Sequence, residues 1–206
     1  MNATWLLQQW NGLAARAALA DAQGIGERLL ACYAEPHRAY HTSAHLRDVL
    51  ERLQDVLDDR LQLAAWFHDA VYDPRRRDNE ERSAMLALRL LLERGYAPTD
   101  AAFVADAVRA TAAHGGGDAV APLLDADLAI LAAHDATYRA YAAAVRREYA
   151  HVPGWMFARG RAAFLSRLLE RPTIYLTPRG VACCEQAARE NIRRELAGMK
   201  RGVRCA

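Results

Sequence analysis

The sequence lacks the features that mark membrane proteins, secreted proteins and nucleic-acid-binding proteins. It holds no apolar run of about 18 residues or more, the length that a membrane-spanning helix needs. Its N-terminal stretch, MNATWLLQQWNG, has no basic start followed by an apolar segment, as a secretory signal would. The formal net charge of +2 is too small to indicate nucleic acid or an anionic membrane as a partner. We therefore expect a cytoplasmic protein with no membrane contact and no specific nucleic-acid binding.

Familiar cysteine and cofactor motifs are also missing. The four cysteines, Cys32, Cys183, Cys184 and Cys205, form no Cys-x-x-Cys pair, and a bridge between the neighbours Cys183 and Cys184 would be strained. Free thiols in a reducing compartment are the expectation that follows. Neither a dinucleotide-binding fingerprint nor a phosphate-loop motif is found in the sequence. The functional signal of the chain therefore lies in its other polar residues.

The residues that are abundant favour helix. Alanine, leucine and arginine dominate, β-branched residues are scarce, and apolar residues recur at three- and four-residue steps. A length of 206 residues suits one domain, so the sequence predicts a single all-α domain over residues 1–206. The expected helices cover approximately residues 5–17, 27–33, 41–57, 61–71, 79–93, 100–113, 126–133, 134–150, 155–169 and 178–196.

Capping signals define some of the expected helix ends. Gly95 lies just past one helix, where a left-handed residue often ends it. Thr99 is expected to cap the helix that begins at Asp100, and Thr177-Pro178 the last helix.

Strongly polar residues interrupt two apolar helical stretches. His68 and Asp69 lie inside AAWFHDAVY, and Asp125 and Asp127 lie inside LLDADLAIL. If these side chains are buried they need partners, and a cation held between helices would serve both pairs. Imidazole nitrogen and carboxylate oxygen suit Zn, Mn, Fe, Co or Ni, and also Mg when carboxylate and water dominate. The alternatives are a satisfied His-Asp pair and a helix N-cap formed by the two aspartates.

A pair of histidines adds to this set. His41 and His45 are four residues apart, which places them on one helix face about one turn apart. Such a pair on a helix can be structural. It supports a metal site only together with the His68-Asp69 and Asp125–Asp127 motifs.

Taken in this order, the motifs YHTSAH (residues 40–45), AAWFHD (64–69) and DADL (125–128) resemble those of the HD superfamily of metal-dependent phosphohydrolases. More narrowly, the chain is similar to a bacterial branch of comparable length in which FHDAVYD, DNEERSA and DADLAIL are typical. The resemblance extends from about residue 40 to residue 191. It implies an HD-type helical bundle with a metal site between central helices, whose core covers about residues 38–150.

The resemblance also implies the metal ligands. His45 matches the first family ligand, His68 and Asp69 match the HD pair, and Asp127 matches the distant aspartate. Asp69 is further expected to orient or deprotonate the attacking water.

Two more histidines receive expected roles. His41 matches a histidine that protonates the leaving group in related cyclic-nucleotide phosphodiesterases, although Thr42 stands where those enzymes have asparagine. His114 is the one histidine between the HD pair and Asp127, where binuclear members usually use two. We expect His114 to contact substrate or water or to be a lone outer ligand. The alternative is a helix-end histidine near the negative end of the helix dipole.

Substrate contacts are expected from arginine, because the guanidinium fork matches phosphate oxygens. The candidates are Arg147 in RREY and Arg161 in ARGRAAF, each with the alternative of a solvated helix face. Glu81 is grouped with them as a carboxylate that orients a ligand imidazole, with a plain surface position as the alternative.

These residues together predict a metal-dependent phosphohydrolase. Its substrate would be a small phosphoester or phosphoanhydride, such as a nucleotide, and its cofactor a divalent Mn, Mg, Co, Ni, Zn or Fe ion. One alternative is a diiron oxygenase, because some HD relatives cleave carbon bonds with oxygen. Another is a non-catalytic nucleotide-binding regulatory module that uses the same pocket. The single intervening histidine argues against the first, and the intact ligand set argues against the second.

Overall fold

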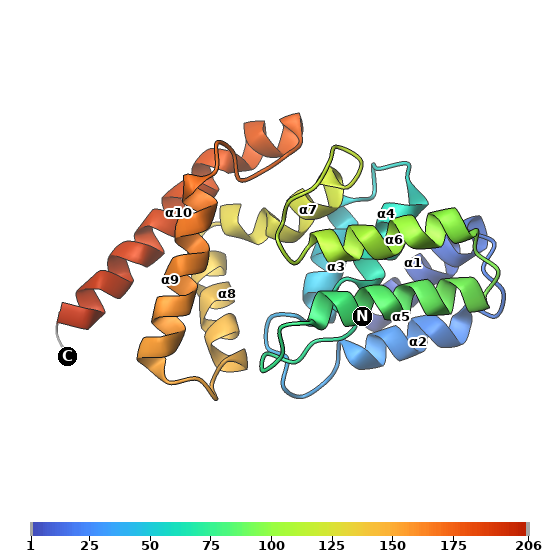
Figure 1. Cartoon of the computed structure of the whole chain (residues 1–206), viewed down its shortest axis with the longest axis horizontal. Helices are drawn as coiled ribbons and strands as arrows, with labels where there is room; N and C mark the ends of the chain where they lie inside the picture. The colour runs from blue at the N-terminus through green and yellow to red at the C-terminus, as the bar shows by residue number, and fades with distance from the viewer. Residues whose placement is uncertain (1, 205–206) are drawn as a thin grey trace. The chain divides into compact units, whose positions relative to one another are not determined.

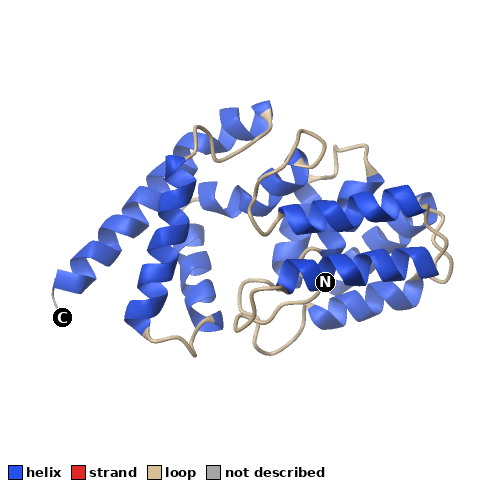
Figure 2. Ribbon diagram, viewed as in Figure 1, coloured by secondary structure: helices blue, strands red, loops and turns tan. Residues whose placement is uncertain are grey.

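The computed structural model describes residues 2–204, with side chains from residue 3 to residue 199, and every regular element in that range is a helix (Figure 2). The all-α prediction is confirmed. No helix within this range is long and apolar enough to cross a membrane. The α-helices, labelled in Figure 1, are α1 (Asn2–Arg16), α2 (Gln23–Cys32), α3 (Ser43–Arg52), α4 (Asp59–Phe67), α5 (Asn79–Glu93), α6 (Pro98–Ala110), α7 (Ala121–Leu128), α8 (Asp135–Glu148), α9 (Gly154–Glu170) and α10 (Pro178–Arg204). A short 3₁₀ helix, η1 (Ala129–Ala132), follows α7.

The chain forms two compact units. The first contains the residues up to Ala126, and the second contains the residues from Asp127 onward, so the boundary falls within α7. Compactness alone does not make a unit an independent domain. The prediction of one domain over residues 1–206 therefore stays a prediction.

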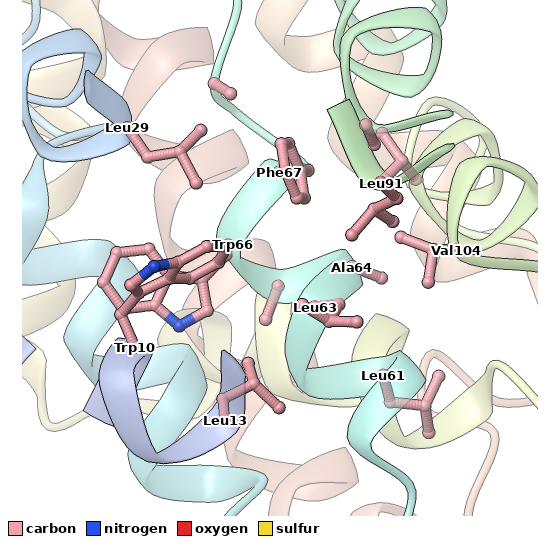
Figure 3. Close-up of a cluster of buried hydrophobic side chains, with 14 of the residues drawn as sticks. Trp10, Leu13, Leu29, Leu61, Leu63, Ala64, Trp66, Phe67, Leu91 and Val104 are labelled. Atoms are coloured by element: carbon pink, nitrogen blue, oxygen red, sulfur yellow. The ribbon is translucent and has the colours of Figure 1, made fainter. Parts of the chain in front are cut away.

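Helix α4 is the centre of the first unit. It packs against α1, α3, α5 and α6, and Figure 3 shows its side chains among Trp10 of α1, Leu29 of α2 and Val104 of α6. A helix that is apolar around its whole circumference is one buried on all sides. Its C-terminal residue, Phe67, is fully buried, so the core fixes the point from which the chain continues into His68. The buried residues of α4 are Leu61, Leu63, Ala64, Ala65, Trp66 and Phe67.

Helix boundaries agree with two of the three capping predictions. Gly95 has φ +80°, the left-handed conformation expected just past α5. Thr177 Oγ1 accepts a hydrogen bond from the Gly180 backbone N at 2.9 Å, which caps α10. The Thr99 prediction is wrong, because α6 begins at Pro98, whose ring presets φ for a first helical position.

The prediction of free thiols can be compared with the structure for three of the four cysteines. Cys32, Cys183 and Cys184 are free thiols, as expected. Cys205 lies outside the described residues.

The second unit is held together by buried hydrogen bonds as well as by apolar packing. Helix α10 packs against η1 and α9. The buried side chain of Asn191 donates from Nδ2 to the carbonyl oxygens of Leu131 and Ala133, at 2.9 and 2.8 Å. Tyr175 donates from its hydroxyl to the Leu128 carbonyl oxygen at 3.0 Å. These bonds satisfy carbonyl groups at the ends of helices, where intrahelical partners are missing.

A substitution at Gly26 tests the packing of α2 against α1. A Cβ at this position would lie 2.4 Å from Cδ1 and 2.7 Å from Cγ of the Trp10 indole. The indole cannot easily move, because it is fully buried and its Nε1 donates to the Ala22 carbonyl oxygen at 2.7 Å. We expect Gly26→Ala to lower the free energy of unfolding by about 1–3 kcal/mol, as other overpacked cores do, when measured by urea denaturation.

The matched control is Gly24→Ala in the same helix, where an added Cβ meets nothing within 4 Å. Alanine should there keep or raise the stability by up to about 1 kcal/mol, because it has the higher helix propensity. Equal unfolding free energies for the two variants would show that Trp10 gives way.

Candidate metal site

Three of the four predicted ligands converge in the first unit. His45 lies in the first turn of α3, His68 caps the C-terminal end of α4, and Asp69 follows it. The Nε2 atoms of His45 and His68 are 3.1 Å apart. Asp69 Oδ2 is 3.1 Å from His68 Nε2 and 3.6 Å from His45 Nε2. One potential ligand atom from each residue lies within 4.8 Å of the others, so this group, the His-Asp cluster, can hold a metal ion.

A backbone carbonyl orients the ring of His68. Its Nδ1 lies 2.8 Å from the carbonyl oxygen of Ala65. A carbonyl oxygen only accepts hydrogen bonds, so Nδ1 carries a proton and donates it to Ala65, which leaves Nε2 facing the cluster. Metal-binding histidines are commonly oriented by this type of contact. The donor set of two imidazole nitrogens and a carboxylate oxygen fits a divalent transition metal.

The electrostatics of the cluster favour the ionised form of Asp69. Burial by itself would raise the pKa of its carboxyl group. The imidazoles of His68, His41 and His45 outweigh this effect, and the pKa lies below its ordinary value. The cluster thus favours an anionic ligand oxygen beside two imidazole nitrogens.

His68 and Asp69 lie beyond the end of a helix, which corrects the prediction that the helix continues to Val71. The last helical residue is Phe67, and the Trp66 carbonyl oxygen accepts a hydrogen bond from the hydroxyl of Tyr33 at 3.2 Å. A helix carbonyl satisfied from outside does not require a further turn of helix. Asp69 is therefore placed by a turn, whereas the predicted helix would have pointed it along a helical face.

Side chains from α5 hold the turn that carries Asp69, residues 68–73. Ser83 Oγ accepts a hydrogen bond from the backbone N of Val71 at 3.0 Å and donates to its carbonyl oxygen at 3.3 Å. Asn79 makes the same pair of contacts with Asp73, at 3.1 and 2.9 Å. These two residues belong to the DNEERSA stretch, so their place in that motif was visible in the sequence while their role was not.

His41 lies beside the cluster but on no helix, which corrects the predicted common face with His45. Helix α3 begins at Ser43, and Thr42 is its N-cap, with its side chain accepting from the Ala44 backbone N at 3.4 Å. Asparagine and threonine both serve as N-caps, so threonine at position 42 is compatible with this helix start. The ring centroid of His41 is 5.9 Å from that of His45 and 4.3 Å from that of Tyr72. The two histidine rings are therefore close together, as predicted, although only His45 lies on a helix.

Glu81 is on the surface, and the expectation that it orients a ligand imidazole needs correction. It lies in the first turn of α5 and accepts two hydrogen bonds from the Arg109 guanidinium, at 2.7 and 2.9 Å. This contact lowers the pKa of the Glu81 carboxyl. The Ala65 carbonyl and not Glu81 orients His68.

The role of His114 stays a prediction. The residue is half-buried in a turn after α6, which ends at Ala110, earlier than predicted. Its φ of +45° lies in the left-handed region, which is uncommon for a residue other than glycine.

Asp127 belongs to the second unit. It is half-buried in the last turn of α7, and Asp125 on the same helix is buried. The N-cap alternative for these aspartates is wrong, because they lie at the helix end opposite to an N-cap. Burial raises the pKa of the Tyr141 hydroxyl, and the negative charge of Asp127 contributes to that rise. The prediction that Asp127 is a fourth metal ligand stays a prediction.

Arg161 is buried within the second unit, which corrects both interpretations of it. Its Nε and Nη2 donate to the Glu195 carboxylate at 3.0 and 3.3 Å, and its Nη1 donates to the Tyr141 hydroxyl at 2.9 Å. The side chain is therefore neither a solvated helix face nor a fork open to phosphate. Arg147 is exposed in the last turn of α8, and its predicted contact with phosphate stays a prediction.

No family model, curated protein or solved structure matches the chain. The case for the metal site accordingly rests on the residues themselves, their geometry and the motifs they form.

Proposed function

We propose that this chain is a divalent-metal-dependent phosphohydrolase acting on a small phosphoester or phosphoanhydride. The observation that carries the proposal is the convergence of His45 Nε2, His68 Nε2 and Asp69 Oδ2 within 4.8 Å of one another. The resemblance of the same residues to the HD motifs supports the reaction class. A bound divalent ion would act as a Lewis acid that activates water and neutralises phosphoryl charge.

The residues of the cluster divide into a buried part and an accessible part. The side chains of His45 and His68 are 3% and 2% exposed, whereas that of Asp69 is 16% exposed. His45 and His68 would hold the ion, and Asp69 would both ligate it and take a proton from the attacking water. The phosphate-bearing substrate would approach from the side of Asp69.

His41 would supply the proton that the leaving oxygen needs. Its ring is next to His45 on one side and Tyr72 on the other, at centroid distances of 5.9 and 4.3 Å. An imidazole held in this way is close enough to the cluster to act as a general acid on a substrate bound there. In the proposed reaction water attacks phosphorus, Asp69 accepts one proton, and His41 donates one to the departing oxygen.

The ligand count favours hydrolysis over diiron oxygen chemistry. A diiron site needs a second set of ligands, and the described part of the chain contains one group of three such side chains. Hydrolysis at a single ion needs no more than three protein ligands and open positions for water and substrate.

The test is phosphate release by the purified full chain. The protein is stripped with a chelator, loaded separately with Mn²⁺, Co²⁺, Ni²⁺ or Mg²⁺, and offered a panel of nucleotides, sugar phosphates and aryl phosphates. We expect turnover with at least one metal and substrate class, and loss of turnover when chelator is added again. Metal content is measured on the same samples.

Three outcomes would count against the proposal. Protein that holds metal but hydrolyses nothing on the panel would contradict phosphohydrolase activity. Tight nucleotide binding without turnover would favour a regulatory module. Two irons per chain together with oxygen consumption would favour an oxygenase.

A further inference from the structure

A buried arginine, Arg38, lies behind the His-Asp cluster. Its side chain is fully buried, although it falls in the polar stretch EPHRAYH, where an arginine is normally expected at the surface. The carboxylate of Glu35 balances its charge, accepting hydrogen bonds from Nε at 3.0 Å and from Nη2 at 2.9 Å. A guanidinium removed from water in this way is costly unless all its donors find partners.

The remaining donors of Arg38 go to the backbone of the two residues that are proposed to move protons. Nη1 donates to the carbonyl oxygen of Asp69 at 2.7 Å and to that of His41 at 3.1 Å. Nη2 donates to the carbonyl oxygen of Ala70 at 3.3 Å. One planar group therefore bonds to the segment around His41 and to the distant segment around Asp69, and joins them beside the cluster.

Two aromatic rings restrict the orientation of this guanidinium. Its central carbon lies 5.3 Å from the ring centroid of Tyr33 and 5.3 Å from that of Tyr72, within the range of cation–π contact. Tyr72 is also the ring next to His41. The contacts with the two rings thus define the direction in which the Nη atoms point. A flexible lysine ammonium would not reproduce this fixed direction of its donors.

Neither Asp69 nor His41 has regular secondary structure to fix its backbone. Asp69 follows the end of α4, and His41 precedes the start of α3. In both segments the guanidinium of Arg38 donates to a backbone carbonyl that no regular secondary structure satisfies. A side-chain donor that bonds both carbonyls sets the distance between the two backbones.

We propose that Arg38 is a positioning residue that fixes the Asp69 carboxylate and the His41 imidazole relative to each other. The inference rests on the proposed function for the role of these two groups. A buried ion pair is weak evidence for net stability, so we assign the main effect of Arg38 to the geometry of the site. Its loss should therefore weaken metal binding and loosen the two turns more than it changes the fold.

The experiment compares Arg38→Lys and Arg38→Met with a control, Arg60→Lys, all in the full chain. Arg60 is also in the first unit, pairs with Asp58 and Asp100, and lies over a ring, that of Phe103 at 4.2 Å. None of these contacts involves a residue of the His-Asp cluster. Arg60→Lys therefore makes the same arginine-to-lysine change away from the candidate metal site. Co²⁺ is the probe, followed by its visible absorption spectrum and by calorimetric titration.

We expect Arg38→Lys to bind Co²⁺ about 10- to 100-fold more weakly, the usual effect of removing an orienting partner, and to show an altered Co²⁺ spectrum. Arg38→Met should be weaker still, because lysine can restore part of the hydrogen bonding. Arg60→Lys should bind as the unaltered chain does. Unchanged Co²⁺ affinity and spectrum in Arg38→Lys would overturn the proposal, even if Arg38→Met does not fold.

Hydrogen exchange of the metal-free proteins separates this proposal from the proposed function. In Arg38→Lys we expect faster amide exchange at residues 39–42 and 69–73, with helix α6 unchanged. If the unaltered chain binds no Co²⁺, the proposed function fails, whereas faster exchange in these two turns would still support the positioning role of Arg38. Unchanged exchange there would show that Arg38 does not hold the turns.

Discussion

We expect the His68→Ala chain to lose metal binding and, with it, metal-dependent stabilisation and hydrolysis. His68 contributes the buried nitrogen that lies within 3.1 Å of both His45 Nε2 and Asp69 Oδ2. A ligand that binds only the folded state at 100 times its Kd stabilises that state by about 2.7 kcal/mol. The unaltered chain should therefore melt at a higher temperature when Mn²⁺ or Co²⁺ is added, and His68→Ala should not respond.

A second variant separates loss of a ligand from loss of the fold. Asp69→Asn keeps the size and shape of the side chain but removes the charge, so its helix content should match that of the unaltered chain while its metal response is lost. His134→Ala replaces a histidine at the N-cap of α8 that is not one of the cluster residues, and it should keep the full metal response. A normal metal-induced rise in melting temperature in both His68→Ala and Asp69→Asn would refute the assignment of the cluster.

The largest stability effect is expected in the second unit, at Glu195. This residue accepts hydrogen bonds from Arg161 at 3.0 and 3.3 Å and from the Tyr138 hydroxyl at 2.5 Å, and the two charged side chains are 6% and 13% exposed. Burial and the neighbouring carboxylate both raise the pKa of Tyr138, so its hydroxyl stays protonated and donates. Glu195→Ala would leave the Arg161 charge buried without its carboxylate partner, with only the Tyr141 hydroxyl to accept from it. We expect a loss of about 3–5 kcal/mol in the free energy of unfolding, measured by urea denaturation with circular dichroism.

Two further variants show whether the effect comes from the unpaired charge. Glu190→Ala removes an exposed carboxylate from the same helix, where it accepts a hydrogen bond from Gln186, and should change stability by less than about 0.5 kcal/mol. The double variant Arg161→Met with Glu195→Met removes both charges and should be more stable than Glu195→Ala. If the double variant were the less stable of the two, the unpaired Arg161 charge would not be the source of the loss in Glu195→Ala.

Much of the helical content and the ligand types followed from local sequence. Helix propensity and apolar spacing act over a few residues, so they predicted an all-α chain and the approximate position of most helices. Gly95 and Thr177 acted within one turn of their own helices, and both predictions are confirmed. His68 and Asp69 stood out for a related reason, since polar side chains in apolar stretches need partners. His45 stood out by its spacing from His41 and by the resemblance to the HD motifs.

The sequence failed where the partner is far away in the chain. Helix α4 ends at Phe67 because its last carbonyls meet donors such as the Tyr33 hydroxyl, which no local pattern can reveal. Glu81 pairs with Arg109, 28 residues later, and so belongs to the surface. Arg161 pairs with Glu195, 34 residues later, and so belongs to the interior.

The sequence by itself determined that this protein is helical, and it singled out two histidines and an aspartate as candidate metal ligands. Only the tertiary structure decided that Asp69 lies on a turn, that His41 lies off the helix, and that Arg38 joins both backbones from a buried position. The physical reason is the range of the interactions. Helix formation depends on neighbours a few residues away, whereas the burial of a charge and the end of a helix depend on which distant donors and acceptors folding brings together.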